Sequence, residues 1–201
     1  MKNYTYIIAS IPALGENPET FSGEVTPSID WILSSLEGED LRKAGLLLRS
    51  FEPDGPCQAF YEEALRSRSA YIKRYFTEEL RLRSAKARST NRFLGRPEGS
   101  DIPEIASTIP SDPIKQKEFD AILGGSDILA KEKALDAYLW KVSSEAVLLE
   151  GFTLDRILGI LTKLCIIRRW LRLDRESGQA MFRSLLQEAR TTYGKIDFSK
   201  I

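Results

Sequence analysis

The longest stretch of mainly hydrophobic positions extends from residue 152 to residue 173 and reads FTLDRILGILTKLCIIRRWLRL. At about 100° per residue, its apolar side chains share one broad arc of an α-helix. The side chains on this arc are Ile157, Leu158, Ile160, Leu161, Leu164, Cys165, Ile167 and Leu171. An arc this wide predicts a central helix that several neighbours contact. The stretch is not a membrane span, because a span needs about 20 mainly apolar residues and this stretch is interrupted by charged side chains.

The polar residues of this stretch predict how the helix begins. Thr153 can cap its first turn, and Asp155 suits the positive end of the helix dipole. Asp155, Gly159, Thr162 and Lys163 fall on the side opposite the apolar arc. This side is therefore the more polar one.

Arg168 falls in the middle of the apolar arc, where an unpaired charge would be very costly. We expect a buried or half-buried guanidinium paired with a carboxylate from another helix, with Glu79 or Asp136 as the candidates. The alternative is that the helix end has reached solvent by Arg168. The sequence leaves both interpretations open.

Hydrophobic spacing predicts two helices in the N-terminal region, over residues 27–36 and about 39–51. Thr26 is expected to cap the first, with Pro27 in its first turn. The apolar face of the second comprises Leu41, Leu47, Leu48 and Phe51. Residues 4–14 form either a short strand or a helical turn, because the alternation of polar and apolar positions is incomplete there.

No proline or glycine occurs between Cys57 and Leu94, which predicts one long helix or two helices with a break near Ser67–Ser69. In the second half, one arc comprises Ile72, Tyr75, Phe76, Leu80, Leu82, Ala87, Phe93 and Leu94. The opposite side carries an arginine row, defined as Arg74, Arg81, Arg88 and Arg92. Glu79 and Arg83 lie within the apolar arc, and an acid four residues before a base favours an ion pair.

Residues 95–113 contain four prolines and two glycines, which predicts a linker without regular structure. Beyond it we expect helices over about 114–123 and 127–150 and a last helix that Asp174 caps. The apolar arc of the second comprises Ile128, Leu135, Tyr138, Leu139, Val142, Ala146 and Leu149. The predicted fold is an all-α bundle of about six to eight helices, in which residues 1–94 and 114–201 can form two helical subdomains.

Composition narrows the range of functions. The chain has 201 residues, a formal net charge of zero and no histidine. Without histidine, the common Ser–His and Cys–His nucleophiles cannot be assembled, and neither a phosphate-binding glycine loop nor a zinc motif is present. We therefore expect no catalysis, no cofactor and no metal; an enzyme that uses only carboxylates is the remaining enzyme alternative. Two widely spaced cysteines indicate a reducing, cytoplasmic compartment.

The charges are unevenly distributed, and residues 64–96 hold ten basic and two acidic residues. A basic segment with aromatic residues is typical of nucleic-acid binding, so a nucleic-acid-binding helical domain that uses the arginine row is an alternative. Most of the aromatic residues share the arc opposite the arginines, however, and the chain is neutral overall. We therefore expect core aromatics, with basic helices packed beside acidic ones, and no nucleic acid.

Four segments together resemble a known family. They are YTYIIASIPAL, FTEELRLRSAKARSTNRFLG, AKEKALDAYLW and GFTLDRILGILTKLCIIRRWLRLDRESGQAMF. In order and spacing they are similar to an uncharacterised bacterial family that is encoded in V-type ATPase gene clusters. That family looks like a reduced form of the C-type subunit of V-type ATPases, the counterpart of the eukaryotic d-type subunit.

This resemblance implies a non-catalytic accessory subunit that couples the central stalk to the membrane rotor ring. The implied partners are other V-type ATPase subunits, and the implied location is the cytoplasmic side of the inner membrane, with membrane contact only through the complex. The arginine row is then the candidate interface. It could meet an acidic surface on a neighbouring subunit or acidic segments of its own chain.

Overall fold

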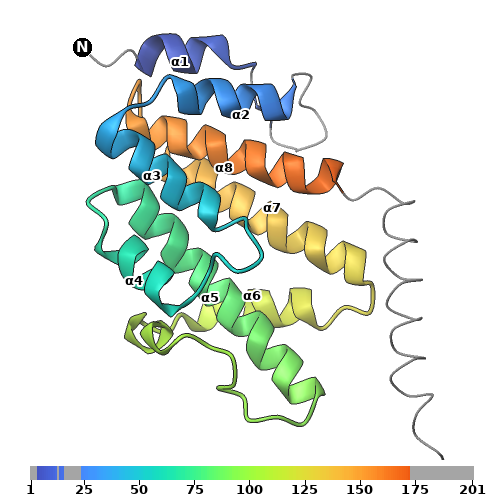
Figure 1. Ribbon diagram of the computed structural model, residues 1–201. Coiled ribbons are helices and arrows are strands. Elements are labelled where there is room, and N and C mark those ends of the chain that lie inside the picture. The colour runs from blue at the N-terminus through green and yellow to red at the C-terminus, as the bar shows by residue number, and fades with distance from the viewer. Residues whose placement is uncertain (1–3, 13, 16–23, 173–201) are drawn as a thin grey trace, which may run out of the picture.

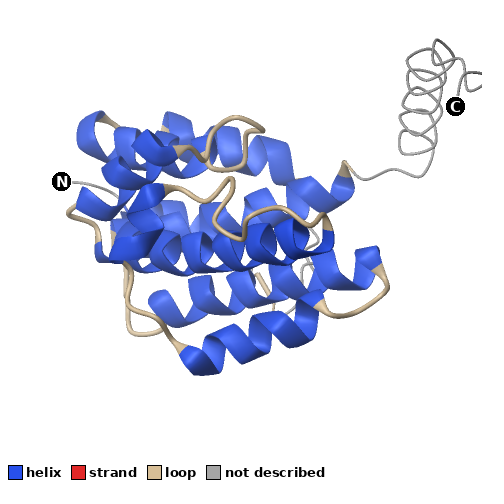
Figure 2. Ribbon diagram, turned by 90° about the horizontal axis from the view of Figure 1, so that it is seen from below, coloured by secondary structure: helices blue, strands red, loops and turns tan. Residues whose placement is uncertain are grey.

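The computed structural model describes residues 4–12, 14–15 and 24–172 (Figure 1), and within them the chain is entirely helical (Figure 2). The predicted all-α fold of six to eight helices is confirmed, since the described part contains eight α-helices and no strand. The first helices are α1 (Tyr4–Ser10), α2 (Val25–Ser34), α3 (Gly38–Arg49), α4 (Gln58–Arg66) and α5 (Ala70–Phe93). They are followed by the 3-10 helix η2 (Glu104–Thr108) and by α6 (Pro113–Leu123), α7 (Ile128–Ala146) and α8 (Leu154–Leu171).

Helix α8 is the centre of the bundle, as its wide apolar arc predicts. It packs against α1, α2, α3, α5 and α7 (Figure 1). The side chains of Ile157, Leu158, Leu161 and Leu164 are all 0 % exposed. A helix surrounded in this way transmits any displacement of one neighbour to the others, because close-packed interiors deform little.

Part of the side of α8 opposite the apolar arc is also buried, since Gly159 and Thr162 are both covered by neighbouring helices. Gly159 allows a close approach of the chains, since a Cβ there would lie 3.0 Å from Cγ1 of Val147. The Thr162 hydroxyl donates to the carbonyl of Leu158 at 3.0 Å and also contacts the Tyr71 hydroxyl at 2.6 Å. A small residue and a locally satisfied hydroxyl therefore let α7 and α5 cover this side.

Asp155 connects the beginning of α8 to the beginning of α5. Its Oδ1 accepts from the Ser69 hydroxyl at 2.7 Å and its Oδ2 accepts from the backbone N–H of Tyr71 at 3.1 Å. Ser69 is the N-cap of α5 and accepts from the N–H of Ile72 at 3.1 Å. Asp155 interacts favourably with the dipole of α8 and thus also accepts a hydrogen bond from a free backbone N–H at the N-terminus of α5.

We expect Asp155→Ala to lower the free energy of unfolding by about 1–2 kcal/mol, because it removes a charged acceptor from a helix N-terminus. Urea denaturation measures this change. Asp30 is a matched control because it is exposed on α2, and Asp30→Ala should change stability by no more than about 0.5 kcal/mol. Equal effects of the two variants would contradict the capping role.

The break between α4 and α5 lies at Ser67–Ser69, where the sequence predicts it. The apolar arc of α5 is buried over Ile72, Tyr75, Phe76, Leu80 and Leu82. It does not extend to the end of the helix, since Phe93 is 89 % exposed and Leu94 is 54 % exposed. The segment after α5 folds back onto Asn91, which is 2 % exposed, but it leaves Phe93 and Leu94 uncovered at the end of α5, which projects beyond its neighbours (Figure 1).

The segment 95–113 is built into the fold, and the prediction that it lacks regular structure is wrong. It contains η2, which packs against α4 and α5. Ile105, Ala106 and Ile109 contact the hydrophobic core, and Asn91 Nδ2 donates to the carbonyl of Ser100 at 2.7 Å. The four prolines limit the backbone conformations of this segment, but they do not prevent the apolar side chains between them from packing onto α4 and α5. One hydrophobic cluster includes residues from both sides of this segment.

Several helix ends also differ from the predictions. Residues 4–10 are helical, and α2 begins at Val25 with Glu24, in place of Thr26, at the N-cap. Helix α7 ends at Ala146, four residues before the predicted end. As a result Leu149 is exposed, as are Ile128 and Leu41 elsewhere. The predicted last helix after Asp174 lies outside the described residues.

The described part of the chain contains no helix with both the length and the apolar character that a membrane span requires.

Candidate functional site

Arg81, in the middle of the arginine row, is part of a network of ion pairs within the chain. Its side chain is 19 % exposed and lies 3.3 Å from Glu78 and 3.9 Å from Asp112. Its guanidinium also donates to the carbonyl of Pro110 at 2.9 Å. Lys115 donates to the same Glu78 carboxylate at 2.6 Å. Charge reversal at Arg81 would place a third carboxylate beside two others and would disturb the fold, so Arg81 is not a free surface cation.

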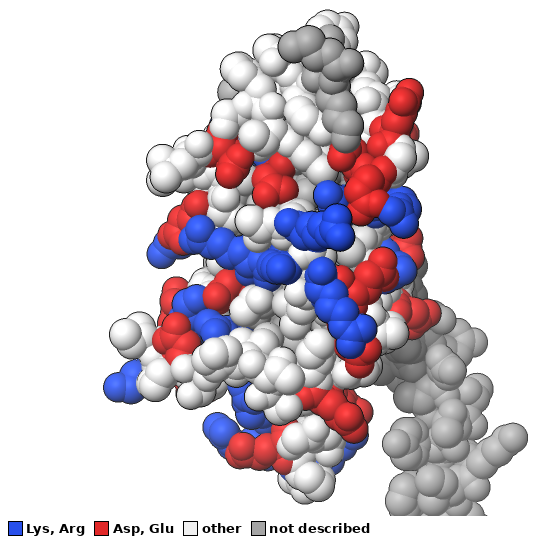
Figure 3. Space-filling model, turned by 90° about the vertical axis from the view of Figure 1, so that its left-hand side faces the viewer, with Lys and Arg blue, Asp and Glu red and all other residues white. Residues whose placement is uncertain are grey.

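The other three arginines of the row also have partners within the chain. The pairs are Arg74 with Glu145 at 3.4 Å, Arg88 with the amide oxygen of Gln116 at 3.3 Å, and Arg92 with Glu98 at 3.2 Å. These contacts favour the alternative in which the row meets acidic and polar segments of its own chain. Figure 3, which views the left-hand side of Figure 1, likewise shows basic side chains interspersed with acidic ones.

The predicted pair of Glu79 and Arg83 is confirmed. Arg83 donates to one carboxylate oxygen from Nε at 3.1 Å and from Nη2 at 3.0 Å. The other oxygen accepts from the Tyr61 hydroxyl at 2.5 Å. Burial raises the pKa of Tyr61, and the Glu79 carboxylate raises it further. Both carboxylate oxygens are therefore satisfied in an apolar environment, as a buried charge requires.

The prediction that Arg168 pairs with the carboxylate of Glu79 or Asp136 is wrong. Arg168 is half-buried, and Nη2 donates to the Cys165 sulfur at 3.8 Å. Asp136 instead binds the neighbouring Arg169 and accepts from the indole N–H of Trp170 at 2.7 Å. Successive residues point about 100° apart around a helix, so the rotation of α8 against α7 decides which of the two arginines meets Asp136. Asp136 is 4 % exposed, and burial raises its pKa while Arg169 lowers it.

The connection between α7 and α8 forms an exposed hydrophobic surface that we name the apolar turn, defined as Leu148, Leu149 and Phe152. These side chains are 74 %, 96 % and 59 % exposed. Leu148 also lines a groove of about 260 Å³, whose other walls are helices α7 and α8 and the side chains of Ile8, Ile11, Pro12 and Leu14. Exposed apolar side chains gathered in one short segment are a candidate surface for binding another protein.

Sequence reasoning missed the apolar turn because it extended the preceding helix to residue 150 and assigned Leu149 to the core. The signal was the double leucine directly before Glu150 and Gly151. Once α7 ends at Ala146, the side chains that follow lose the helical periodicity that would direct them inward. Among the described residues, no group of three or more metal-binding side chains occurs.

Comparisons with known proteins identify a family and nothing closer. No curated protein and no solved structure matched the chain. A family model described as "Protein of unknown function (DUF2764)" matched residues 53–192, which include α4 to α8 and most of the buried core. The chain therefore belongs to this family of proteins of unknown function.

Proposed function

We propose that this protein is a non-catalytic accessory subunit of a V-type rotary ATPase, where it couples the central stalk to the membrane rotor ring. The support is twofold: four segments of the sequence resemble a reduced C-type subunit, and the apolar turn offers a surface for a partner subunit. It would reach the membrane only through the complex, on the cytoplasmic side.

The apolar turn is the observation that carries the proposal. Burying a leucine or phenylalanine side chain contributes about 1.5–3 kcal/mol, and Leu148, Leu149 and Phe152 are largely exposed. A partner that covers all three would gain stabilisation that the free subunit lacks. This makes the apolar turn a better candidate for the interface than the arginine row, whose members are already bonded within the chain.

The place of the apolar turn in the fold suits a mechanical role. It joins α7 to α8, and α8 contacts five other helices. A force applied at the turn would therefore pass directly into the most constrained helix of the bundle. Close packing around α8 lets the bundle move as one body, which is what a coupling subunit requires.

Nucleic-acid binding, the alternative, has less support. Phosphate contacts need accessible and unpaired cations. Arg81 is 19 % exposed within its ion pairs, and Arg74 and Arg92, although 53 % and 67 % exposed, are each paired with a glutamate. Base stacking needs accessible aromatic rings, and Tyr71, Tyr75 and Phe76 are buried. Of the aromatic residues in this basic segment, Phe93 alone is exposed, and one ring at a helix end makes a small stacking surface.

We expect the wild-type protein to co-purify with V-type ATPase subunits from native membranes, and the double substitution Leu148→Ser with Leu149→Ser to abolish or strongly reduce this. Removing two buried leucines from an interface should weaken binding by about 3 kcal/mol or more, which is over a hundredfold. Quantitative affinity purification of the tagged chain measures the effect.

The matched control is Ile128→Ser with Leu129→Ser, two exposed apolar residues at the beginning of α7, at the other end of that helix. This control should co-purify as the wild type does. If wild-type protein recovers no ATPase subunit, the proposed function is wrong. If both double variants bind as wild type, the ATPase assignment stands but the interface lies elsewhere.

A further inference from the structure

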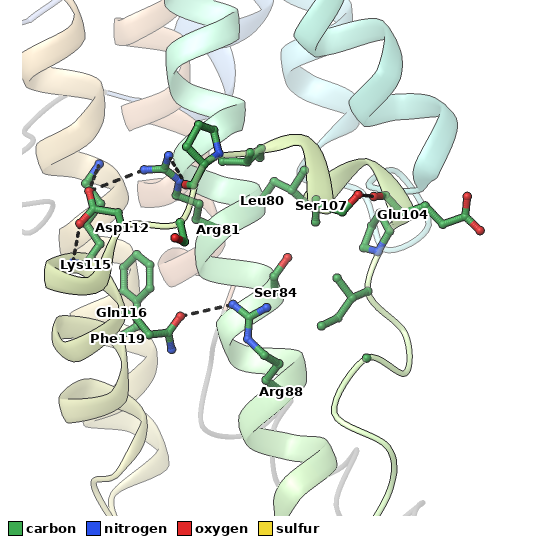
Figure 4. Close-up of a pocket in the computed structure, with 17 residues that line it drawn as sticks. Leu80, Arg81, Ser84, Arg88, Glu104, Ser107, Asp112, Lys115, Gln116 and Phe119 are labelled. Atoms are coloured by element: carbon green, nitrogen blue, oxygen red, sulfur yellow. Dashed lines mark hydrogen bonds and ion pairs between the residues drawn. The ribbon is translucent and has the colours of Figure 1, made fainter.

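A cavity of about 360 Å³ lies between α5, the segment that carries η2, and the beginning of α6 (Figure 4). It lies apart from the apolar turn and plays no part in the function proposed above. Its walls combine apolar side chains, among them Leu80, Ile109 and Phe119, with polar groups from α5. This combination of an apolar lining with a few placed polar groups is typical of small-molecule sites.

The serine at the centre of this cavity has an unused hydrogen-bonding group. Ser84 is 3 % exposed, and its hydroxyl has no partner among the described residues. In Figure 4 the hydroxyl points away from α5, toward the side of the cavity formed by Ser107. A buried hydroxyl without a partner costs about 1–3 kcal/mol, so its retention at a cavity wall indicates that a ligand supplies the partner.

Arg88, one helical turn after Ser84, supplies a charge to the same cavity. It contacts the neutral amide oxygen of Gln116 at 3.3 Å, which is long for an N–H to oxygen bond. Residues four apart on a helix lie on one face, so the Arg88 guanidinium and the Ser84 hydroxyl flank the same space. A carboxylate would form a shorter and stronger bond with Arg88 than the amide does.

The other charges of the cavity indicate the charge of the ligand. Arg81 and Lys115 also line it, and both pair with Glu78 and Asp112. Glu104 lines the opposite side, and its carboxylate points away from the cavity in Figure 4. Among the lining cations, Arg88 is thus the one without a carboxylate partner in the described part of the chain, which matches a ligand with a single negative charge.

We propose that this cavity binds a small organic monocarboxylate with an apolar body. The carboxylate accepts from the Arg88 guanidinium and from the Ser84 hydroxyl, and the apolar body contacts Leu80, Ile109 and Phe119. The Nε–H of Arg81, which is buried and has no partner within the described ranges, is a third donor from the same helix. A dianionic phosphate ester fits less well, because the remaining cations are already neutralised.

The test uses the full chain with sodium octanoate as the probe and isothermal titration calorimetry as the measurement. We expect saturable binding of one octanoate, and much weaker binding of neutral octanamide. Arg88→Gln should weaken octanoate binding by about tenfold or more, since a charge-assisted bond is lost. Arg92→Gln is the matched control, because Arg92 lies on the same helix, pairs with Glu98 and does not line the cavity.

Ser84→Ala separates binding from folding. If the hydroxyl serves to bind a ligand, its removal leaves the melting temperature of the free protein unchanged or raises it, and weakens octanoate binding. A lowered melting temperature with unchanged octanoate binding would show that the hydroxyl is structural. Absence of saturable binding by both octanoate and phenylacetate, equal binding by Arg88→Gln, or tighter binding of inorganic phosphate would each overturn the proposal.

Discussion

Leu161→Ala is expected to lower the free energy of unfolding by about 2–5 kcal/mol, enough to remove a large part of the stability of a domain of this size. Leu161 is 0 % exposed on α8, the helix that contacts five others. The variant loses the transfer free energy of the deleted atoms, and the rigid surroundings cannot fully close the cavity that remains. Urea denaturation followed by circular dichroism measures the change.

The control for Leu161→Ala is Leu149→Ala, the same substitution at a side chain that is 96 % exposed. It should change the free energy of unfolding by no more than about 0.5 kcal/mol. Similar losses in the two variants would contradict the central position of α8. A large loss for Leu149→Ala alone would show that the apolar turn is covered within the protein itself.

Arg169→Met is expected to have the second-largest effect, a loss of about 2–3 kcal/mol at neutral pH, because an uncompensated charge is left buried. The substitution leaves the carboxylate of Asp136 with the indole N–H of Trp170 as its remaining donor. Breaking a fully buried pair costs about 3–5 kcal/mol, and the smaller value follows because the Arg169 side chain is 44 % exposed. Arg168→Met is the matched control, since Arg168 has no carboxylate partner among the described residues.

The loss in Arg169→Met should depend on pH with a definite sign. Burial already raises the pKa of Asp136, and removal of Arg169 raises it further, toward the protonated form. A carboxyl group whose pKa is higher in the folded state binds more protons there, so its contribution to stability falls as pH rises through the folded pKa. The difference from wild type should thus be largest at about pH 7 and shrink toward about pH 4.

Urea denaturation of wild type, Arg169→Met and Arg168→Met at both pH values checks this sign. A loss in Arg169→Met that is the same at both pH values would mean that packing, and not the charge of Asp136, is responsible. A loss as large in Arg168→Met would mean that the wrong arginine has been assigned to the pair. Glu132, which lies 3.7 Å from Arg169, adds to the destabilisation because it repels the ionised Asp136.

Local hydrogen bonding and periodicity made several features predictable. The break between α4 and α5, the cap at Thr153 and the pair of Glu79 and Arg83 each depend on residues within about one helical turn. The same holds for the buried Cys165 and the wide arc around it. Such features need no information about distant parts of the chain, so they follow from spacing alone.

Features that depend on the relative placement of elements were not predictable in the same way. Spacing could not distinguish Arg168 from Arg169 as the partner of Asp136, because the rotation of α8 against α7 is set by packing. It likewise could not show that Asp155 caps α5, since the two sites are far apart in sequence. The arginine row has the expected helical spacing, yet apart from Glu78 on α5 itself its partners come from α6, α7 and the segment after α5.

By itself, the sequence determined that the described part of this chain is an all-helical bundle around the stretch that begins near Thr153, because helix formation and its apolar face are local properties. The tertiary structure alone decided which surfaces remain for function. It placed η2 against α5 and so created the cavity at Ser84 and Arg88, and it ended α7 at Ala146 and so exposed the apolar turn. Both outcomes depend on how separate helices pack against one another. The sequence of a single helix does not determine that packing.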